Sequence, residues 1–440
     1  MTENLRQIAL EIVVEVLEHG EYSNRLLNAT LQKYQYLEKN KRSFLSRLTL
    51  GTIEHKIELD AYVDLYSNTP VRKMKPVIRN IMRISVYQMV YMDGIPVSAV
   101  CNEAVKLANA KGFRQLKGFV NGVLRNVARG LEAYGAEGLI MKTCEDKPFE
   151  EQLSLIYSMP QWIVEEWLEE FGKTQARAML AAFLTEKATV IRTNLSKTTP
   201  EKLRATLESE GVTVEPVEEL PYAFAIHGFD HLGGLKSFND GLFYVQDISS
   251  MMVSEQLELS AGQQVLDVCA APGGKSLHAA TFVGDSGHVE ARDVSYDKVS
   301  LIEENIARNQ VTNVSAKVWD ATVLDEDCIG KMDRVIADLP CSGLGVLSGK
   351  PEIKYRVTKE DVLSLAALQR QMLDVVCQYV KVGGRMAFST CTINHFENED
   401  NTMWFLENHP EFTLISREQM LPKPGLLDGF YIAVLERKEV

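Results

Sequence analysis

Two cysteine peptides and one glycine turn hold the residues that could do chemistry. Residues 265–275 (VLDVCAAPGGK) predict a strand, a glycine turn and a helix, whereas residues 337–343 (ADLPCSG) and 389–392 (STCT) each place a cysteine just past an apolar strand. A thiolate is a strong nucleophile toward electron-poor carbon. A glycine turn at a helix N-terminus lets backbone amides approach a ligand closely. The sequence therefore predicts a nucleotide-type cofactor loop beside two reactive thiols, Cys341 and Cys391.

The acids that follow the glycine turn narrow the choice of cofactor. The turn has neither the GxGxxG spacing of dinucleotide binders nor the phosphate-cradling GxxxxGK[ST] spacing. Asp293 ends the next predicted strand, about 20 residues on, where an acid commonly takes a ribose hydroxyl. Asp320 follows the strand after that and suits an adenine amino group. A single Asp there is more often a cap or turn residue, but acids at successive strand ends favour a site. A site with acids for ribose and adenine but no phosphate-binding loop indicates S-adenosylmethionine as the cofactor.

The chemistry of the two cysteines points to a pyrimidine acceptor. One cysteine at a strand end is most often a packed hydrophobe, but PCSG is polar and contains a glycine, and STCT is likewise polar. Cytosine C5 is unreactive until a nucleophile adds at C6, and a cysteine beside a methyl donor supplies that step. His395 lies close to Cys391 in sequence and reads better as a surface residue than as a base. Seven scattered cysteines without CxxC predict neither a disulfide framework nor a metal site.

The elements that must position these residues begin near residue 236. From there to 440, predicted strands alternate with helices, which indicates a doubly wound parallel α/β sheet. The first strand is expected at 242–246, and a late antiparallel pair at 411–416 and 429–436. Ligands of such a sheet bind beyond the carboxyl ends of its strands. The cofactor loop, the acids and both cysteines all fall at strand ends.

The rest of the chain divides into three segments. Residues 1–140 show helical periodicity and predict an all-α domain, 141–158 read as a linker, and 159–235 as a small α+β module. The net charge is −13, yet Lys and Arg exceed Asp and Glu within 1–140. Basic side chains recur at two places there: Arg72, Lys73, Lys75, Arg79 and Arg83, then Lys111, Arg114, Lys117, Arg125 and Arg129. They could neutralise phosphates or form a solvated helix face, and the sequence leaves both readings open.

The same survey gives several expected absences. No apolar run approaches ~18 residues, so no transmembrane helix is expected. The first residues, MTENLRQIALEIV, do not read as a signal peptide, and a cytoplasmic location is expected. At 440 residues the chain should form two or three domains.

In their order and spacing, CAAPGGK, DLPCSG and STCT resemble the RNA 5-methylcytosine methyltransferase family. Residues 241–253, 350–356 and 428–437 are also similar to its pattern. The N-terminal helices, with GFVNGVLRN at 118–126, resemble the NusB-like RNA-binding domain of the bacterial RsmB (Sun, Fmu) type. The resemblance implies a NusB-like domain, a small α+β RNA-binding module and a Rossmann-like class I methyltransferase domain. It also implies 16S rRNA as substrate and S-adenosylmethionine as cofactor, and a monomer is expected, without membrane or metal.

Residue roles follow from the resemblance. Cys391 would add to cytosine C6, Cys341 would assist release as a base, and Asp338 would contact the cytosine N3/N4 edge as well as the cofactor. Lys275 and Lys354 are weaker candidates for positioning substrate, and Leu339 departs from the alanine more common in the family. The residues implied in cofactor binding are Cys269, Ala270, Ala271, Pro272, Gly273, Gly274, Lys275, Asp293, Asp320 and Asp338.

Three alternatives remain at this point. DNA cytosine-5 methylation uses the same chemistry, but its nucleophile is the Pro-Cys peptide, and a second cysteine is not needed. A non-catalytic RNA-binding or antitermination protein would fit the helical domain alone, not the intact cofactor and cysteine peptides. Within the family, tRNA could replace 16S rRNA, and only the resemblance of the N-terminal half favours rRNA.

Overall fold

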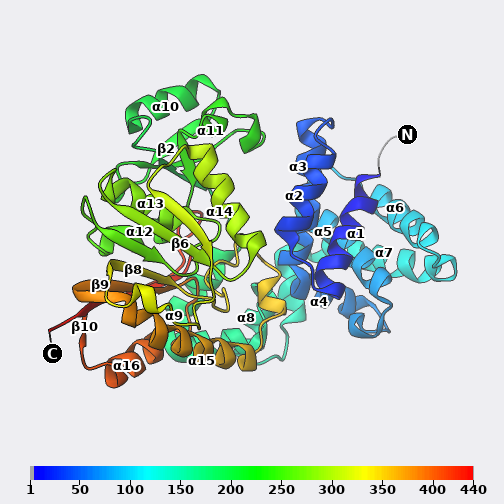
Figure 1. Cartoon of the computed structure of the whole chain (residues 1–440). Helices are drawn as coiled ribbons and strands as arrows, with labels where there is room; N and C mark the ends of the chain where they lie inside the picture. The colour runs from blue at the N-terminus through cyan, green and yellow to red at the C-terminus, as the bar shows by residue number, and fades with distance from the viewer. Residues whose placement is uncertain (1–3, 440) are drawn as a thin grey trace. The chain divides into compact units, whose positions relative to one another are not determined.

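A computed structural model describes residues 4–439, which divide into two compact units (Figure 1). One unit comprises residues 1–184 together with 347–356, and the other comprises 185–346 together with 357–440. The chain thus leaves the second unit after Val346 and returns to it at Val357. We call the first the helical unit and the second the catalytic unit.

The helical unit confirms the all-α prediction for the N-terminal segment. Its most buried helix is α5, Pro76–Tyr91, in which residues 80–88 are all buried. Apolar residues at helical spacing from the surrounding helices pack with it into one core, which is why the periodicity was readable from sequence. The helices are α1 (Leu5–His19), α2 (Ser23–Lys33), α3 (Lys39–Glu54), α4 (Lys56–Tyr66), α5, α6 (Val97–Ala110), α7 (Lys117–Thr143), α8 (Phe149–Ile156) and α9 (Gln161–Phe183).

The stretch 141–158, predicted as a linker, is mostly helical. Helix α7 continues to Thr143, and α8 begins at Phe149, directly after Pro148. Proline is well tolerated at a helix start, so Pro148 marks a beginning here and not a disordered connection. Leu153 and Ser154 of α8 are buried, and both α8 and α9 belong to the helical unit.

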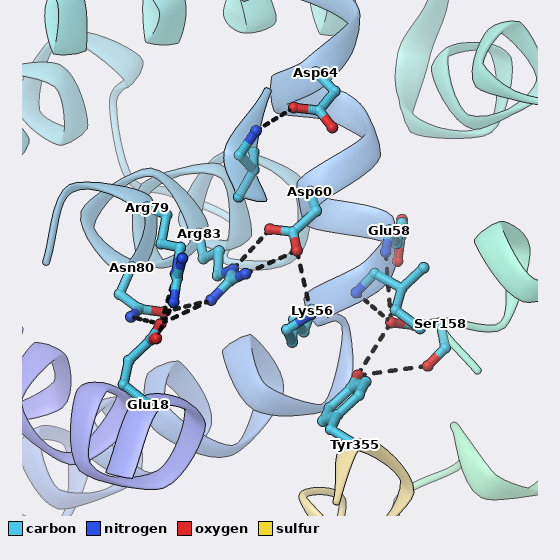
Figure 2. Close-up of polar contacts among 12 residues, drawn as sticks. Glu18, Lys56, Glu58, Asp60, Asp64, Arg79, Asn80, Arg83, Ser158 and Tyr355 are labelled. Carbon is cyan, nitrogen blue, oxygen red and sulfur yellow. Dashed lines mark hydrogen bonds and ion pairs between the residues drawn. The ribbon is translucent and has the colours of Figure 1, made fainter. Parts of the chain in front are cut away.

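The segment 347–356 is an insertion from the C-terminal half of the sequence into the helical unit. Glu352 accepts hydrogen bonds from the backbone N (3.0 Å) and the Oγ (2.6 Å) of Ser23 at the start of α2. Lys354 Nζ and Tyr355 Oη both donate to the backbone carbonyl of Glu54, each at 2.9 Å. Tyr355 also contacts Ser158 (Figure 2). Burial lowers the pKa of Lys354 to about 8. Lys354 has its hydrogen-bond partner inside this unit, and its expected part in positioning substrate stays a prediction.

Arg79 and Arg83 pair with internal carboxylates and are not available to phosphates. Figure 2 shows Arg83 reaching Asp60 of α4 through two bonds, Nε–Oδ1 at 2.7 Å and Nη2–Oδ2 at 2.8 Å. Arg79 forms an ion pair with Glu18 of α1. Both readings of these two side chains from sequence, phosphate contact or solvated face, are therefore wrong, because carboxylates distant in sequence satisfy them. Arg72, Lys73 and Lys75 remain exposed.

The catalytic unit begins with a small antiparallel sheet in the order β2-β3-β1-β4. Thr199 caps helix α10 through its side chain, and Pro200 occupies its first turn. Strand β4 pairs with β1, so the stretch 242–246, predicted to start the larger sheet, completes the smaller one. A five-residue apolar run cannot indicate which sheet it joins. The elements are β1 (Thr189–Thr193), α10 (Pro200–Ser209), β2 (Thr213–Pro216), β3 (Ala223–His227), α11 (Lys236–Asn239) and β4 (Phe243–Val245).

The larger sheet has the order β10-β11-β9-β8-β5-β6-β7, with β9, β8, β5, β6 and β7 parallel. Strands β10 and β11 form the predicted antiparallel pair at one edge. The doubly wound fold is confirmed. The elements are α12 (Ile248–Gln256), β5 (Gln264–Asp267), α13 (Gly274–Val283), β6 (His288–Asp293), α14 (Tyr296–Asn309), β7 (Val314–Val318), β8 (Met332–Asp338), α15 (Lys359–Val376), β9 (Val380–Thr390), α16 (Glu399–Asn408), β10 (Phe412–Met420) and β11 (Phe430–Arg437).

Helices cover both faces of this sheet. Leu266, Val335 and Phe388 pack with residues of α15 and α16 in one apolar cluster. Their neighbours Val265 and Ile336 pack with α12, α13 and α14 in another. Successive strand residues point to opposite faces, so each strand contributes to both cores. This burial fixes the strands and leaves their carboxyl ends to carry polar groups.

Candidate active site

The predicted cofactor loop connects β5 to α13 through a tight turn. Gly273 has a φ of +103°, which an L side chain rarely adopts, and a Cβ there would lie 3.4 Å from Ile302 of α14. The backbone N of Gly273 donates to Ala270 O at 2.6 Å, and the backbone N of Ala270 donates to Arg292 O at 2.8 Å. The loop therefore docks onto the end of β6, and glycine is required at 273 by conformation.

Two buried carboxylates stand at the ends of β5 and β6 beside this loop. Asp293 Oδ2 accepts from the backbone N of Ala271 (3.0 Å), while Oδ1 accepts from the N of Val294 (2.8 Å) and pairs with Lys298 Nζ (3.0 Å). Asp267 accepts from Ser276 Oγ at 2.6 Å, and burial raises its pKa to about 7. A rigidly held carboxylate at the end of the second parallel strand fits a sugar hydroxyl, because a carboxylate can accept more bonds than Asp293 makes here.

Asp320 and Cys269 have different surroundings. Asp320 lies two residues past β7, is exposed, and accepts from the N and Oγ1 of Thr322, which lowers its pKa. The structure shows no contact of Asp320 with the cofactor loop. Cys269 is half-buried, and desolvation together with the nearby carboxylates Asp293 and Asp267 raises its pKa. Its thiol is held protonated and suits a scaffolding position.

The two cysteines predicted to be reactive lie together. Cys341 follows β8 and Cys391 follows β9, neighbouring parallel strands, and their sulfurs are 3.2 Å apart. The backbone N of Gly345 also donates to Cys391 O at 3.0 Å, which joins the two peptides. The hydrogen bond with Cys391 and burial hold the pKa of Cys341 well above its ordinary value.

Asp338 connects the cysteine pair to the cofactor loop. Its Oδ2 accepts from Lys275 Nζ at 2.7 Å, and its Oδ1 accepts from Ser389 Oγ at 2.8 Å. Lys275 also lies over the ring of Phe430, 5.4 Å from the centroid. Burial alone would lower the pKa of Lys275, but the Asp338 carboxylate raises it above its ordinary value. One half-buried ion pair therefore joins the helix after the loop to the end of β8.

Residues that sequence reasoning missed surround the two cysteine peptides. The carboxylate of Glu397 is buried and accepts hydrogen bonds from Ser342, Gln369 and Asn394. The run FENED at 396–400 reads as an exposed acidic helix start, and no pattern in it marks one acid as internal.

Within residues 4–439, no cluster of His, Cys, Asp or Glu could hold a metal ion. No helix of that part is long and apolar enough to cross a membrane.

The sheet order, the glycine turn after β5 and the acid after β6 define a class I methyltransferase domain. Residues 254–436 match the family described as 16S rRNA methyltransferase RsmB/F, residues 3–129 match the NusB family, and residues 159–229 match the RsmF/B-like ferredoxin-like domain. The chain belongs to the RsmB/F family of 16S rRNA methyltransferases.

Individual relatives agree over nearly the full length of the chain. The probable ribosomal RNA small subunit methyltransferase B of Bacillus subtilis is 34% identical over 97% of this chain and 94% of its own. The ribosomal RNA small subunit methyltransferase B of Pectobacterium carotovorum is 31% identical, with 98% of each chain covered. The crystal structure of PH0851 has the same fold, with a TM-score of 0.83, 23% identity, and coverage of 99% of this chain and all of that one.

Proposed function

We propose that this protein transfers a methyl group from S-adenosylmethionine to C5 of a cytosine in 16S rRNA. The observation that carries the proposal is the pair of thiols on neighbouring strand ends, 3.2 Å apart, in a chain of the RsmB/F family. Methylation of a base nitrogen or a ribose oxygen needs no thiol, because those atoms already carry lone pairs. A pyrimidine C5 does need one, because only addition at C6 makes C5 nucleophilic.

Each polar group at the thiol pair has a role in this reaction. Cys391 adds to C6 of the cytosine, and the resulting enamine carbon C5 takes the methyl group. Asp338, held by Lys275 and Ser389, contacts the N3/N4 edge of the base and favours the addition. Cys341 releases its own proton to solvent and, as a thiolate, accepts the C5 proton, and Cys391 then leaves C6 as a thiolate. Once Cys391 is bonded to C6, its sulfur is an uncharged thioether and only a weak hydrogen-bond acceptor, so the interaction that most raises the pKa of Cys341 is weakened.

The residues around the glycine turn fit the cofactor. S-adenosylmethionine supplies an electrophilic methyl group on a sulfonium. The loop from Cys269 to Lys275 would hold its methionine part, Asp293 would accept from the ribose hydroxyls, and Asp320 would accept from the adenine amino group. The buried, backbone-anchored Asp293 gives the strongest support for this placement. Asp320 is exposed and bonded within its own turn, so its part rests on the family resemblance.

Replacing Asp293 with asparagine is expected to weaken S-adenosylmethionine binding by about 10–100-fold, because a hydrogen bond to a charged group contributes roughly 1.5–3 kcal/mol. Titration calorimetry on the full chain measures the change. Asp297→Asn is the matched control, since Asp297 is an exposed acid in the first turn of α14. A dissociation constant for D293N within twofold of that of the unchanged protein would contradict the assignment of Asp293.

The RNA must present its cytosine outside a base stack, because stacking covers C6. The helical unit, whose residues 3–129 match the NusB family, is proposed to hold the surrounding RNA through phosphate contacts. The exposed basic side chains available for this are Arg72, Lys73, Lys75, Arg114, Lys117, Arg125 and Arg129. The protein is proposed to act in the cytoplasm as a monomer.

The test of substrate and product is bisulfite sequencing of 16S rRNA and of tRNA, each incubated with the protein and S-adenosylmethionine. We expect one new protected cytosine in 16S rRNA and none in tRNA. If protected cytosines appeared only in tRNA, the proposed reaction would stand and the proposed substrate would change from 16S rRNA to tRNA. An unchanged pattern in both RNAs, with the cofactor bound, would overturn the proposal.

A further inference from the structure

The carboxylate of Glu397 is the centre of a buried polar network behind the two cysteine peptides. Glu397 lies between β9 and α16 and has no exposed surface. Its Oε1 accepts from the backbone N of Ser342 (2.9 Å) and from Gln369 Nε2 (3.1 Å). Its Oε2 accepts from Ser342 Oγ and from Asn394 Nδ2. Four donors therefore converge on one carboxylate.

The partners of Glu397 are the residues that flank the two thiols. Ser342 directly follows Cys341, and Gln369 Nε2 also donates to the carbonyl of Pro340, which precedes Cys341, at 2.8 Å. On the other peptide, Thr392 directly follows Cys391, and Asn394 Nδ2 donates to Thr392 Oγ1 at 3.0 Å. Ser342 Oγ and Thr392 Oγ1 contact each other at 2.8 Å. The network thus joins the peptide of Cys341 to the peptide of Cys391.

A carboxylate is needed at this point because all four partners donate. A glutamate side chain only accepts, whereas a glutamine of the same shape presents two N–H donors in place of one oxygen. In a glutamine variant Asn394 would have to turn its own amide. It would then lose its bonds to Thr392 Oγ1 and to the backbone N of Glu397, which donates to Asn394 Oδ1 at 2.9 Å. A buried acid is costly unless it is fully hydrogen-bonded, and Glu397 meets that condition.

We propose that Glu397 is a positioning residue that sets the separation and orientation of the Cys341 and Cys391 thiols. Its hydrogen bonds go to Ser342, Gln369 and Asn394, so it acts on the two cysteine peptides through their neighbours Ser342 and Thr392. The role of those thiols in methyl transfer rests on the proposed function. The separation of the two thiols does not depend on the proposed function, so the positioning by Glu397 can be measured independently of activity.

The test compares Glu397→Gln with Glu399→Gln, which changes an exposed acid two residues away. One readout is the rate of cross-linking by a bis-alkylating bimane that fluoresces only after joining two thiols, with Cys391→Ala as background. The other is the methyl-transfer rate on 16S rRNA, with kcat and KM separated. For E397Q we expect slower cross-linking of the pair and a fall in kcat of about 100-fold, because an error near 1 Å in reacting groups costs that much. KM for RNA should stay within about twofold, and E399Q should match the unchanged protein.

The outcomes separate this inference from the proposed function. Equal cross-linking and equal kcat in E397Q and E399Q would overturn the role of Glu397. Slower cross-linking in E397Q, in a protein that methylates no RNA in any form, would support the positioning role and contradict the proposed function. If circular dichroism shows that E397Q does not fold, Ser342→Ala decides by the same two readouts, because it removes only the hydroxyl that bonds to both Glu397 and Thr392.

Discussion

Cys391→Ala is expected to abolish methyl transfer, with kcat lowered at least about 1000-fold. Without a thiolate to add at C6, cytosine C5 has no means of attacking the methyl donor. S-adenosylmethionine should bind as before, because Cys391 lies at the end of β9 and the glycine turn follows β5. The measurement is single-turnover transfer of a labelled methyl group to 16S rRNA, together with calorimetry of cofactor binding.

The same variant should form no covalent complex with RNA that carries 5-fluorocytosine at the target. In the unchanged protein, release of Cys391 requires loss of the C5 hydrogen as a proton, and a fluorine at C5 cannot leave in this way. Cys391 should therefore stay bonded to C6, and the complex should survive a denaturing gel. Cys101→Ala, which removes a buried thiol from α6 of the helical unit, is the matched control and should leave transfer intact. Methyl transfer by C391A within tenfold of the unchanged protein would contradict the assignment of Cys391 as nucleophile.

Cys341→Ala is expected to trap an intermediate on ordinary, unfluorinated 16S rRNA. Loss of a general base typically costs about 10²–10⁴-fold in rate, here at the step that removes the C5 proton. Cys391 would still add to C6 and the methyl group would still be transferred, so a covalent protein–RNA complex should accumulate. Denaturing electrophoresis of C341A with RNA and S-adenosylmethionine measures it directly.

The double variant C341A/C391A is the control for this trapping, because it lacks the thiol that would form the bond. If C391A trapped the complex and C341A did not, the roles of the two cysteines would be reversed. That arrangement is the one expected of a Pro-Cys nucleophile.

The site was predictable from the sequence where local pattern and topology determine it. Alternating strands and helices predict a parallel sheet, and Asp293, which was predicted to end a strand, is the last residue of β6. Once the strand ends are known, neighbouring parallel strands must bring Cys341 and Cys391 to the same edge. Their 3.2 Å separation confirms that juxtaposition.

The sequence could not predict the features that depend on partners distant in the chain. Glu397 accepts hydrogen bonds from Ser342 and Gln369, and Arg83 donates to Asp60. The residues next to Glu397 and Arg83 in sequence do not indicate that either side chain is buried. The segment 347–356 is polar and short and follows a cysteine peptide of the catalytic unit, so nothing in it indicates that it belongs to the helical unit. Its place in the helical unit depends on Glu352 reaching Ser23, which lies 329 residues away in sequence.

The most direct measurement of the central claim is bisulfite sequencing of 16S rRNA from cells of three kinds. One lacks the gene, one carries it unchanged, and one carries C391A. We predict a single cytosine that is protected only in cells with the unchanged gene. An identical protection pattern in all three would contradict the claim that this protein methylates C5 of a 16S rRNA cytosine through Cys391.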